Sequence, residues 1–213
     1  MPELKQAYPS VQNDNMCSYG GSQMFSDNEM IRRCGCGPVA AYDLLRYLSD
    51  EDALQIMPLA QYREALRTVC RRYLPLIPYR GINGLELALG VNRMLQKKRL
   101  PYRAVWVFSG AKLWDRIREM LAHDLPVILS IGPNFPKVWE KEKLRFYTRS
   151  TDGRYLPSAA TKSHYVTVTG MDDAWLQISS WGRRYYISRS EYKQFVGGHS
   201  SYLFSNILYV KGM

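Results

Sequence analysis

Apolar positions in the first half of the chain recur with the spacing of helices. Residues 41, 44, 45 and 48 follow the i, i+3, i+4, i+7 pattern of one buried helix face, which predicts a helix starting near residue 36. Two further helices are expected over about residues 60–73 and 84–98. Residues 1–32 are polar and turn-rich, so an irregular arm is expected there. The chain before residue 100 is therefore predicted to be mostly helical.

The period changes after residue 101. Strands are expected over about residues 104–108 and 126–131, with an amphipathic helix at 111–122 between them and a polar excursion at 133–162 after them. An antiparallel meander should follow, with strands at about 164–170, 174–181, 183–187 and 203–210 and a short helix at 189–196. This order predicts an α+β fold, a helical part followed by an antiparallel sheet. We expect one domain over residues 1–213, with an arm at 1–32, a mainly helical lobe at 33–100 and a mainly β lobe at 101–213.

Composition indicates an ordinary soluble globular protein. Hydrophobic residues make up 46% of the chain and charged residues 23%. No apolar stretch approaches a membrane span, and the chain start has no basic region followed by an apolar one. A cytoplasmic location is expected, with export left open. The four cysteines are too few and too unevenly spaced for a disulfide scaffold, so they are interpreted as free thiols.

The positive charge is concentrated in one stretch. The net charge is +10, and residues 63–103 hold ten Arg or Lys against two Glu, a net of +8. The spacing of Arg63, Arg67 and Arg71 fits the solvated face of a helix, and the chain shows no recognisable nucleic-acid-binding motif. No nucleic acid partner is therefore expected, and a preference for acidic or anionic partners is left open by the clustered charge.

Cys36 is the candidate nucleophile because it opens an apolar helix. A helix N-terminus offers unpaired N–H groups and the positive end of the macrodipole, which favour a thiolate. The alternative is a small buried side chain at the helix start. Cys34 is interpreted as structural, because a zinc site needs a second ligand pair that the sequence does not offer. No metal and no cofactor are expected.

Three histidines are available as a base for such a nucleophile. His123 lies in a turn and is expected to be solvated, and His199 lies in a glycine-rich stretch interpreted as a flexible loop with no apparent partner. His164 opens a strand directly after a polar loop. A strand can hold an imidazole rigidly at a cleft, so His164 is the predicted base.

The hairpin after His164 limits which residue can orient the imidazole. With a turn at residues 171–173, antiparallel pairing brings Gln177, Ser179 or Ser180 back beside His164. Asp172 and the next residue lie at the far end of the hairpin, some ~25 Å away at ~3.3 Å per residue. A neutral partner is therefore expected.

Four motifs together resemble the papain-like cysteine peptidases. They are Cys36-Gly37-Pro38 at a helix start, DLPVILS at residues 124–130, HYVTVTG at residues 164–170 and SSWG at residues 179–182. Within that superfamily the chain is most similar to the bacteriocin leader-processing (double-glycine) peptidases, over roughly residues 20–210. The resemblance implies a helical lobe packed on an antiparallel sheet, with the active site in the cleft between them. The sequence separation of 128 positions from Cys36 to His164 also fits the roughly 130-residue scale of papain-type pairs.

The resemblance also implies roles for individual residues. Cys36 would be the nucleophile, His164 the base and Ser179 the orienting residue. The family carries Asn or Asp at the third position, so a serine there is a departure that supplies no charge. The family places a Gln shortly before the nucleophile. The best candidate for that oxyanion donor is Gln23, thirteen residues upstream, and Asn28 is the second.

The expected function is a cysteine peptidase or related thiol hydrolase that cleaves an amide bond through an acyl-enzyme, with a peptide or protein as substrate. One alternative is a papain-like fold that binds a peptide or partner without turnover, because the third position lacks a carboxylate or amide. Another is acyl transfer or deamidation by the same Cys36 and His164. The sequence does not separate this from hydrolysis, since both pass through the same acyl-enzyme.

Overall fold

The structure, a computed structural model, describes residues 2–13, 16–49 and 56–213. Its helices are η1 (Gln23–Phe25), α1 (Glu29–Cys34), α2 (Cys36–Leu48), α4 (Leu59–Arg72), α5 (Gly84–Lys97), α6 (Leu113–Ala122) and α7 (Arg189–His199). Its strands are β1 (Val11–Asn13), β2 (Met16–Cys17), β3 (Met57–Pro58), β4 (Tyr102–Trp106), β5 (Val127–Ile131), β6 (Leu144–Arg149), β7 (Tyr155–Thr161), β8 (His164–Met171), β9 (Trp175–Ser180), β10 (Arg183–Ser188) and β11 (Ile207–Gly212).

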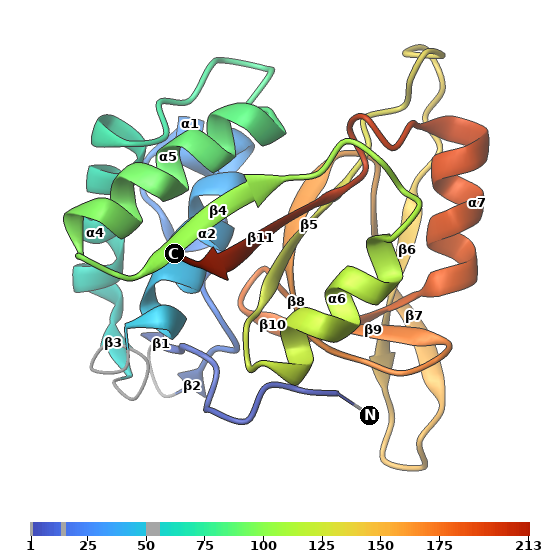
Figure 1. The fold of residues 1–213 in the computed structure, drawn as a ribbon, viewed down its shortest axis with the longest axis horizontal. Coiled ribbons are helices and arrows are strands. Elements are labelled where there is room, and N and C mark those ends of the chain that lie inside the picture. The colour runs from blue at the N-terminus through green and yellow to red at the C-terminus, as the bar shows by residue number, and fades with distance from the viewer. Residues whose placement is uncertain (1, 14–15, 50–55) are drawn as a thin grey trace.

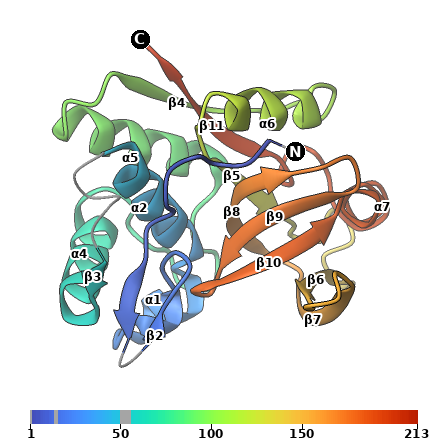
Figure 2. The same ribbon diagram turned by 90° about the horizontal axis from the view of Figure 1, so that it is seen from below.

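One large antiparallel sheet organises the molecule. Its eight strands follow the order β4-β11-β5-β8-β9-β10-β6-β7, and every neighbouring pair is antiparallel. A small sheet of order β2-β1-β3 joins two strands of the N-terminal segment, which precedes α2, to β3, which follows α2. Figure 1 places α2, α4 and α5 together at one end of the molecule and α7 at the other, and Figure 2 shows the same separation from below. The predicted α+β class with an antiparallel sheet is confirmed.

Helices pack against both faces of the sheet because side chains alternate along each strand. In β5, Ile128 joins a buried cluster with apolar residues of α2 and α5. Its neighbours Val127 and Leu129 join a second cluster with apolar residues of α6 and α7. The central strands are thus covered on both sides, which holds β8, and with it His164, in a rigid setting.

Two regions differ from the sequence prediction. The polar excursion at residues 133–162 contains a hairpin, β6 and β7, at the edge of the sheet. In β7 most side chains are exposed and one is Pro157, so the strand shows little of the apolar alternation that identifies strands. The expected irregular arm also forms β1, β2, η1 and α1, and Val11 and Ile31 are buried against α2 and α4 residues.

The turn between β9 and β10 has a conformation that matters for the site. Trp181 and Gly182 have φ angles of 50° and 74°. Two successive residues with positive φ are typical of the tight type I′ hairpin turn, which matches the twist of the two strands. A positive φ is uncommon for a bulky residue such as tryptophan, so this turn holds backbone strain.

Within the described ranges, no helix has the length and apolar character needed to cross a membrane.

Candidate active site

Cys36 is the first residue of α2, as the sequence pattern predicts. Gly35 precedes it without a side-chain cap, and Pro38 occupies the first turn, where its missing N–H costs no hydrogen bond. A Cβ atom at Gly37 would lie 2.5 Å from Ile82 Cδ1 and 3.3 Å from the Tyr165 ring. The glycine therefore lets the start of α2 pack closely against β8.

His164 is the first residue of β8 and pairs with Ile131 of β5. The residue is 7% exposed, and its ring stacks on Trp181, with 4.6 Å between ring centroids and 22° between planes. The Nε2 atom lies 2.8 Å from Ser180 Oγ. When Ser180 accepts a hydrogen bond from Nε2–H, the Nδ1 atom carries the lone pair and can take a proton.

The residue at the imidazole is Ser180, so the placement of Ser179 beside the ring is wrong in this structure. Ser179 Oγ instead donates to the carbonyl oxygen of Tyr19 at 2.8 Å. Ser179 pairs with Thr167 across the β8–β9 ladder. Side chains alternate along a strand, so Ser179 faces away from the His164 side of the sheet and Ser180 faces toward it.

Cys36 and His164 line one small cavity. It measures about 10 Å³, roughly the space of a single water molecule. Contributions come from the N-terminal segment, α2 and the β8–β9 hairpin: Gly21, Gln23, Cys36, Val39, Ala40, Asp43, His164, Tyr165, Val166, Thr167, Ser179, Ser180 and Trp181. The cavity brings together the helix-borne thiol and the strand-borne imidazole.

Cys36 is half-buried and His164 is buried, and burial shifts the pKa of each group in favour of its uncharged form. It raises the pKa of the Cys36 thiol above its usual value, although the backbone N–H groups of Tyr165, Gly37 and Cys36 face the sulfur and lower it. The helix N-terminus was expected to favour a thiolate, and desolvation outweighs it here. Burial also lowers the pKa of His164 to about 3. At neutral pH the site therefore holds a thiol and a neutral imidazole.

Gln23 reaches the same cavity from η1. Its Nε2 donates to the carbonyl oxygen of Arg32 at 2.7 Å, near the end of α1. A primary amide has two N–H donors, so one remains for another acceptor. Asn28, the second candidate, caps α1 instead: its Oδ1 accepts from Ile31 N–H at 3.1 Å.

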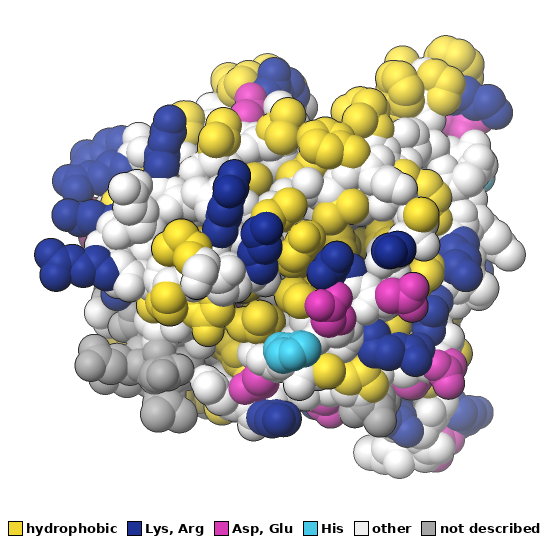
Figure 3. Space-filling model, in the orientation of Figure 1, with side chains coloured by type: hydrophobic (Ala, Val, Ile, Leu, Met, Phe, Trp, Pro, Cys, Tyr) yellow, Lys and Arg dark blue, Asp and Glu magenta, His cyan; other side chains and the backbone are white. Residues whose placement is uncertain are grey.

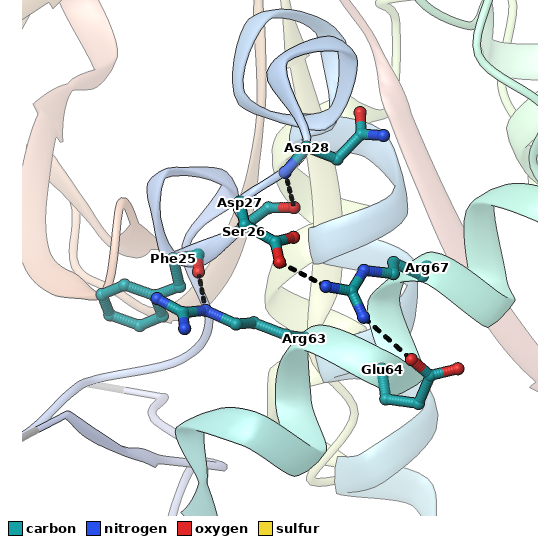
Figure 4. Close-up of polar contacts among 7 residues, drawn as sticks. All are labelled: Phe25, Ser26, Asp27, Asn28, Arg63, Glu64 and Arg67. Carbon is teal, nitrogen blue, oxygen red and sulfur yellow. Dashed lines mark hydrogen bonds and ion pairs between the residues drawn. The ribbon is translucent and has the colours of Figure 1, made fainter.

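Contacts with α4 fix the segment that follows Gln23 (Figure 4). Arg63 Nε donates to the carbonyl oxygen of Phe25 at 2.6 Å. Arg67 bonds Asp27 and Glu64 at the same time. Part of the basic stretch therefore anchors the N-terminal segment to the helical part of the molecule.

Sequence reasoning gave Asp43 no role, yet the structure buries it in the cavity wall. Asp43 lies seven residues after Cys36, on the same face of α2, and the residue is 2% exposed. An aspartate inside the otherwise apolar run of residues 40–45 was the signal that could have identified it.

The remaining cysteines and histidines lie outside the cavity lining. Cys17 is exposed, and burial raises the pKa of Cys70 to about 12. His123 is exposed, as expected. His199 ends α7 and its Nδ1 lies 2.7 Å from Glu140 Oε2, so its expected placement in a loop without a partner is wrong. Among the described residues, no three side chains of the metal-binding types gather closely enough to hold an ion.

Four other basic residues of the stretch line an open groove of about 530 Å³ near the C-terminal ends of α4 and α5. Its lining residues are Arg72, Tyr73, Arg93, Gln96, Lys97 and Arg99. Lys and Arg side chains gather at the left margin of Figure 3, on the side of the molecule where α4 and α5 lie. The groove is separate from the cavity between Cys36 and His164, with which it shares no lining residue.

Comparisons with known proteins give one structural similarity. No known family model matches the chain, and no curated protein matches its sequence. Among solved structures, the chain is similar to a crystal structure of a "putative C39-like peptidase" from Bacillus anthracis. The two chains are 16% identical, the match covers 84% of this chain and 89% of that chain, and the TM-score is 0.47.

Proposed function

We propose that this protein is a thiol hydrolase that cleaves an amide bond in a peptide or protein through an acyl-enzyme on Cys36. One observation carries the proposal: a cysteine at a helix start and a histidine at a strand start line the same buried cavity, with Ser180 on the second ring nitrogen. A nucleophile, a base and a group that orients the base are the parts that this reaction class needs.

In the proposed reaction His164 Nδ1 takes the thiol proton as Cys36 Sγ bonds to the substrate carbonyl carbon. The imidazolium then gives this proton to the leaving amine as the C–N bond breaks, which leaves a thioester. Water, deprotonated by His164, attacks the thioester and releases the acid and the free thiol. Ser180 holds the ring with its second nitrogen turned away from the reacting atoms.

The oxyanion formed at each attack needs hydrogen-bond donors. The second N–H of Gln23 Nε2 and the backbone N–H of Cys36 are the proposed pair. The backbone N–H groups that face the sulfur also stabilise the thiolate in the moment of proton transfer.

A substrate does not fit into about 10 Å³, so the described conformation is a closed form. Turnover therefore requires a wall of the cavity to move. Entry of a polar substrate and water also relieves the desolvation that keeps Cys36 and His164 uncharged.

The small cavity favours a second candidate function, binding of a peptide or partner without turnover. A closed site with two uncharged groups is stable as a packed core, and Ser180 supplies no charge to stabilise an imidazolium. Acyl transfer and deamidation use the same Cys36 acyl-enzyme and differ from hydrolysis only in the acceptor or the leaving group. A preference for acidic or anionic partners stays a prediction, for which the basic groove is the proposed place.

Acetylation by p-nitrophenyl acetate tests the proposal, because this activated ester acylates a catalytic thiol without a specific peptide. We expect the acetyl group to appear on Cys36, to turn over by hydrolysis, and to vanish in Cys36→Ala but not in Cys34→Ala. Peptide mapping by mass spectrometry locates the label among the four cysteines. Labelling of exposed Cys17 alone would contradict the hydrolase proposal, and an acetyl-Cys36 that never hydrolyses would favour binding or acyl transfer.

A further inference from the structure

A buried carboxylate lies beneath the segment that leads to Gln23. Asp43 Oδ2 accepts a hydrogen bond from the Gly21 N–H at 2.7 Å. Among the described residues, Asp43 Oδ1 has no hydrogen-bond partner and is fully buried. A buried carboxylate with one unsatisfied oxygen is costly, so its retention in the cavity wall requires an explanation beyond packing.

Two glycines let the segment lie directly on this carboxylate. A Cβ atom at Gly20 would lie 2.9 Å from Asp43 Oδ2 and 2.1 Å from Ser179 Oγ. A Cβ atom at Gly21 would lie 1.9 Å from Tyr62 Oη. Gly20 also has a φ of 75°, which other residues rarely adopt. No larger side chain fits at either position without displacing the segment from Asp43.

Gly21 connects Asp43 to both sides of the site. Two residues further along the chain, Gln23 lines the cavity with Cys36. The Gly21 carbonyl accepts from the Gly182 N–H at 2.9 Å, and the Tyr19 N–H donates to the Gly182 carbonyl at 2.8 Å. Gly182 follows Trp181, whose ring stacks on His164. The position of one peptide unit thus affects the oxyanion donor and the turn that supports the base.

We propose that Asp43 is a positioning residue of the Cys36 site, whose carboxylate holds Gly21 and thereby places Gln23 for the oxyanion and Trp181 against His164. The inference rests on the proposed function. It assigns Asp43 no contact with substrate, since the carboxylate acts through the backbone of the N-terminal segment.

The surroundings of Asp43 link this contact to pH. Burial raises the pKa of Asp43 to about 7, against the lowering effects of the Gly21 N–H and of Arg46. The titratable and charged groups around it are Arg46 on α2, Tyr62 on α4, Tyr8 and Tyr19 from the N-terminal segment, and the cavity residues Cys36 and His164. As pH falls through about 7, the carboxylate becomes a neutral acid and its charge-assisted bond to Gly21 weakens.

Two reactions of Cys36 separate positioning from mere stability. p-Nitrophenyl acetate forms a bond from Sγ to its carbonyl carbon, passes through an oxyanion and releases p-nitrophenolate, while His164 takes the thiol proton. Iodoacetamide forms a bond from Sγ to a saturated carbon and releases iodide without an oxyanion. Both reactions need the Cys36 thiolate, so the amount of thiolate cancels in the ratio of the two rates. The ratio of acetylation to alkylation therefore measures how well the oxyanion donors stabilise the acetylation step.

In Asp43→Ala we expect the acetylation rate to fall by about 10–100-fold and the alkylation rate to change by less than about 3-fold. Asp43→Asn keeps an acceptor for Gly21 but not the charge. Its rate ratio should be flat from about pH 5.5 to 8.5 and should equal the low-pH ratio of the unmodified chain, which itself rises through about pH 7. The Asp43→Ala effect should largely disappear in a Gln23→Ala background.

Tyr47→Phe is the matched control. It removes a partly buried hydrogen bond of α2, from Tyr47 Oη to Asp124 Oδ1 at 2.6 Å, and leaves the bond to Gly21 in place, so its rate ratio should stay unchanged. An unchanged ratio of the two rates in the folded Asp43→Ala variant, or an Asp43→Asn ratio at pH 8.5 equal to that of the unmodified chain, would overturn the inference. Absence of Cys36 acetylation in the unmodified chain would instead overturn the proposed function, so the two failures are distinguishable.

Discussion

The cavity between Cys36 and His164 holds about 10 Å³, whereas the groove near the ends of α4 and α5 holds about 530 Å³. The cavity is lined by a thiol, an imidazole and a carboxyl group, and desolvation shifts the pKa of each one. The groove is lined by four basic side chains on an open surface, with no acidic residue in its lining.

The comparison shows that these three groups with shifted pKa values lie in the small cavity and not in the large groove. Electrostatic effects and proton transfers are strong where water is excluded, and weak where side chains are solvated and screened. The larger concavity offers long-range attraction for anions, and the smaller one offers fixed geometry. Each prediction below tests one side of this contrast.

Replacement of the base should have the largest effect. We expect His164→Gln to lower the acetylation rate of Cys36 by about 10³-fold, within the usual range for loss of a general base. His123→Gln and His199→Gln should stay within about 2-fold, because neither ring lines the cavity. The measurement is stopped-flow release of p-nitrophenolate. A His164→Gln rate near that of the unmodified chain would mean that the cavity is a packed core without catalytic geometry.

The pH dependence of the free energy of unfolding tests whether water is excluded from the His164 ring. The unfolded pKa of histidine is about 6.5 and the folded pKa of His164 is about 3, so the native state resists protonation. Stability from the neutral ring is fully present above about pH 6.5 and is lost as pH falls toward 3. At about pH 4.5 this loss is about 3 kcal/mol.

We therefore expect the free energy of unfolding to fall between about pH 8 and 4.5 by about 3 kcal/mol more in the unmodified chain than in His164→Gln. Asp43, whose raised pKa changes stability with pH in the opposite direction, is present in both proteins, so its contribution cancels in the comparison. Urea titrations at each pH measure it, with His123→Gln as the exposed control. Parallel pH profiles for the unmodified chain and His164→Gln would show that water reaches the ring.

Substitution of each of the two adjacent serines tests which one orients the imidazole. Ser180→Ala should lower the acetylation rate by about 10-fold, because His164 Nε2 loses its partner at 2.8 Å. Ser179→Ala should change that rate by less than about 3-fold and lower the free energy of unfolding by about 1 kcal/mol, since it loses the bond to the Tyr19 carbonyl. The reverse pattern of rates would restore Ser179 as the orienting residue.

Much of the fold was predictable because its elements show clear periods. The α2 pattern at residues 41, 44, 45 and 48 gave the helix that carries Cys36, and the apolar runs gave β5 and β8. The β6–β7 hairpin was missed because an edge strand needs no continuous apolar face. The arm was underestimated because burial of Val11 and Ile31 depends on contacts distant in sequence.

The site was predictable only where local position decides the chemistry. Cys36 and His164 were found from their places at the start of a helix and a strand, and their catalytic roles remain proposals. Ser180 was among three hairpin candidates, and the ladder register selected it over Ser179. The expected thiolate at Cys36 is not favoured, because the effect of the helix end is local, whereas desolvation of the thiol is set by the whole fold. The proposed role of Asp43 could be inferred only from its hydrogen bond to Gly21, which no local sequence pattern predicts.

Removal of charge from the groove should have the smallest effect, and only on anion binding. We expect Arg93→Gln with Arg99→Gln to weaken binding of inorganic polyphosphate a few-fold at low salt and to flatten its salt dependence. Arg154→Gln is the matched control, because Arg154 is ion-paired with Asp152 at 2.6 Å on the exposed hairpin. Fluorescence titration measures binding, and acetylation of Cys36 should stay within about 2-fold. A large loss of acetylation in the groove variant would show that the groove and the cavity act as one site.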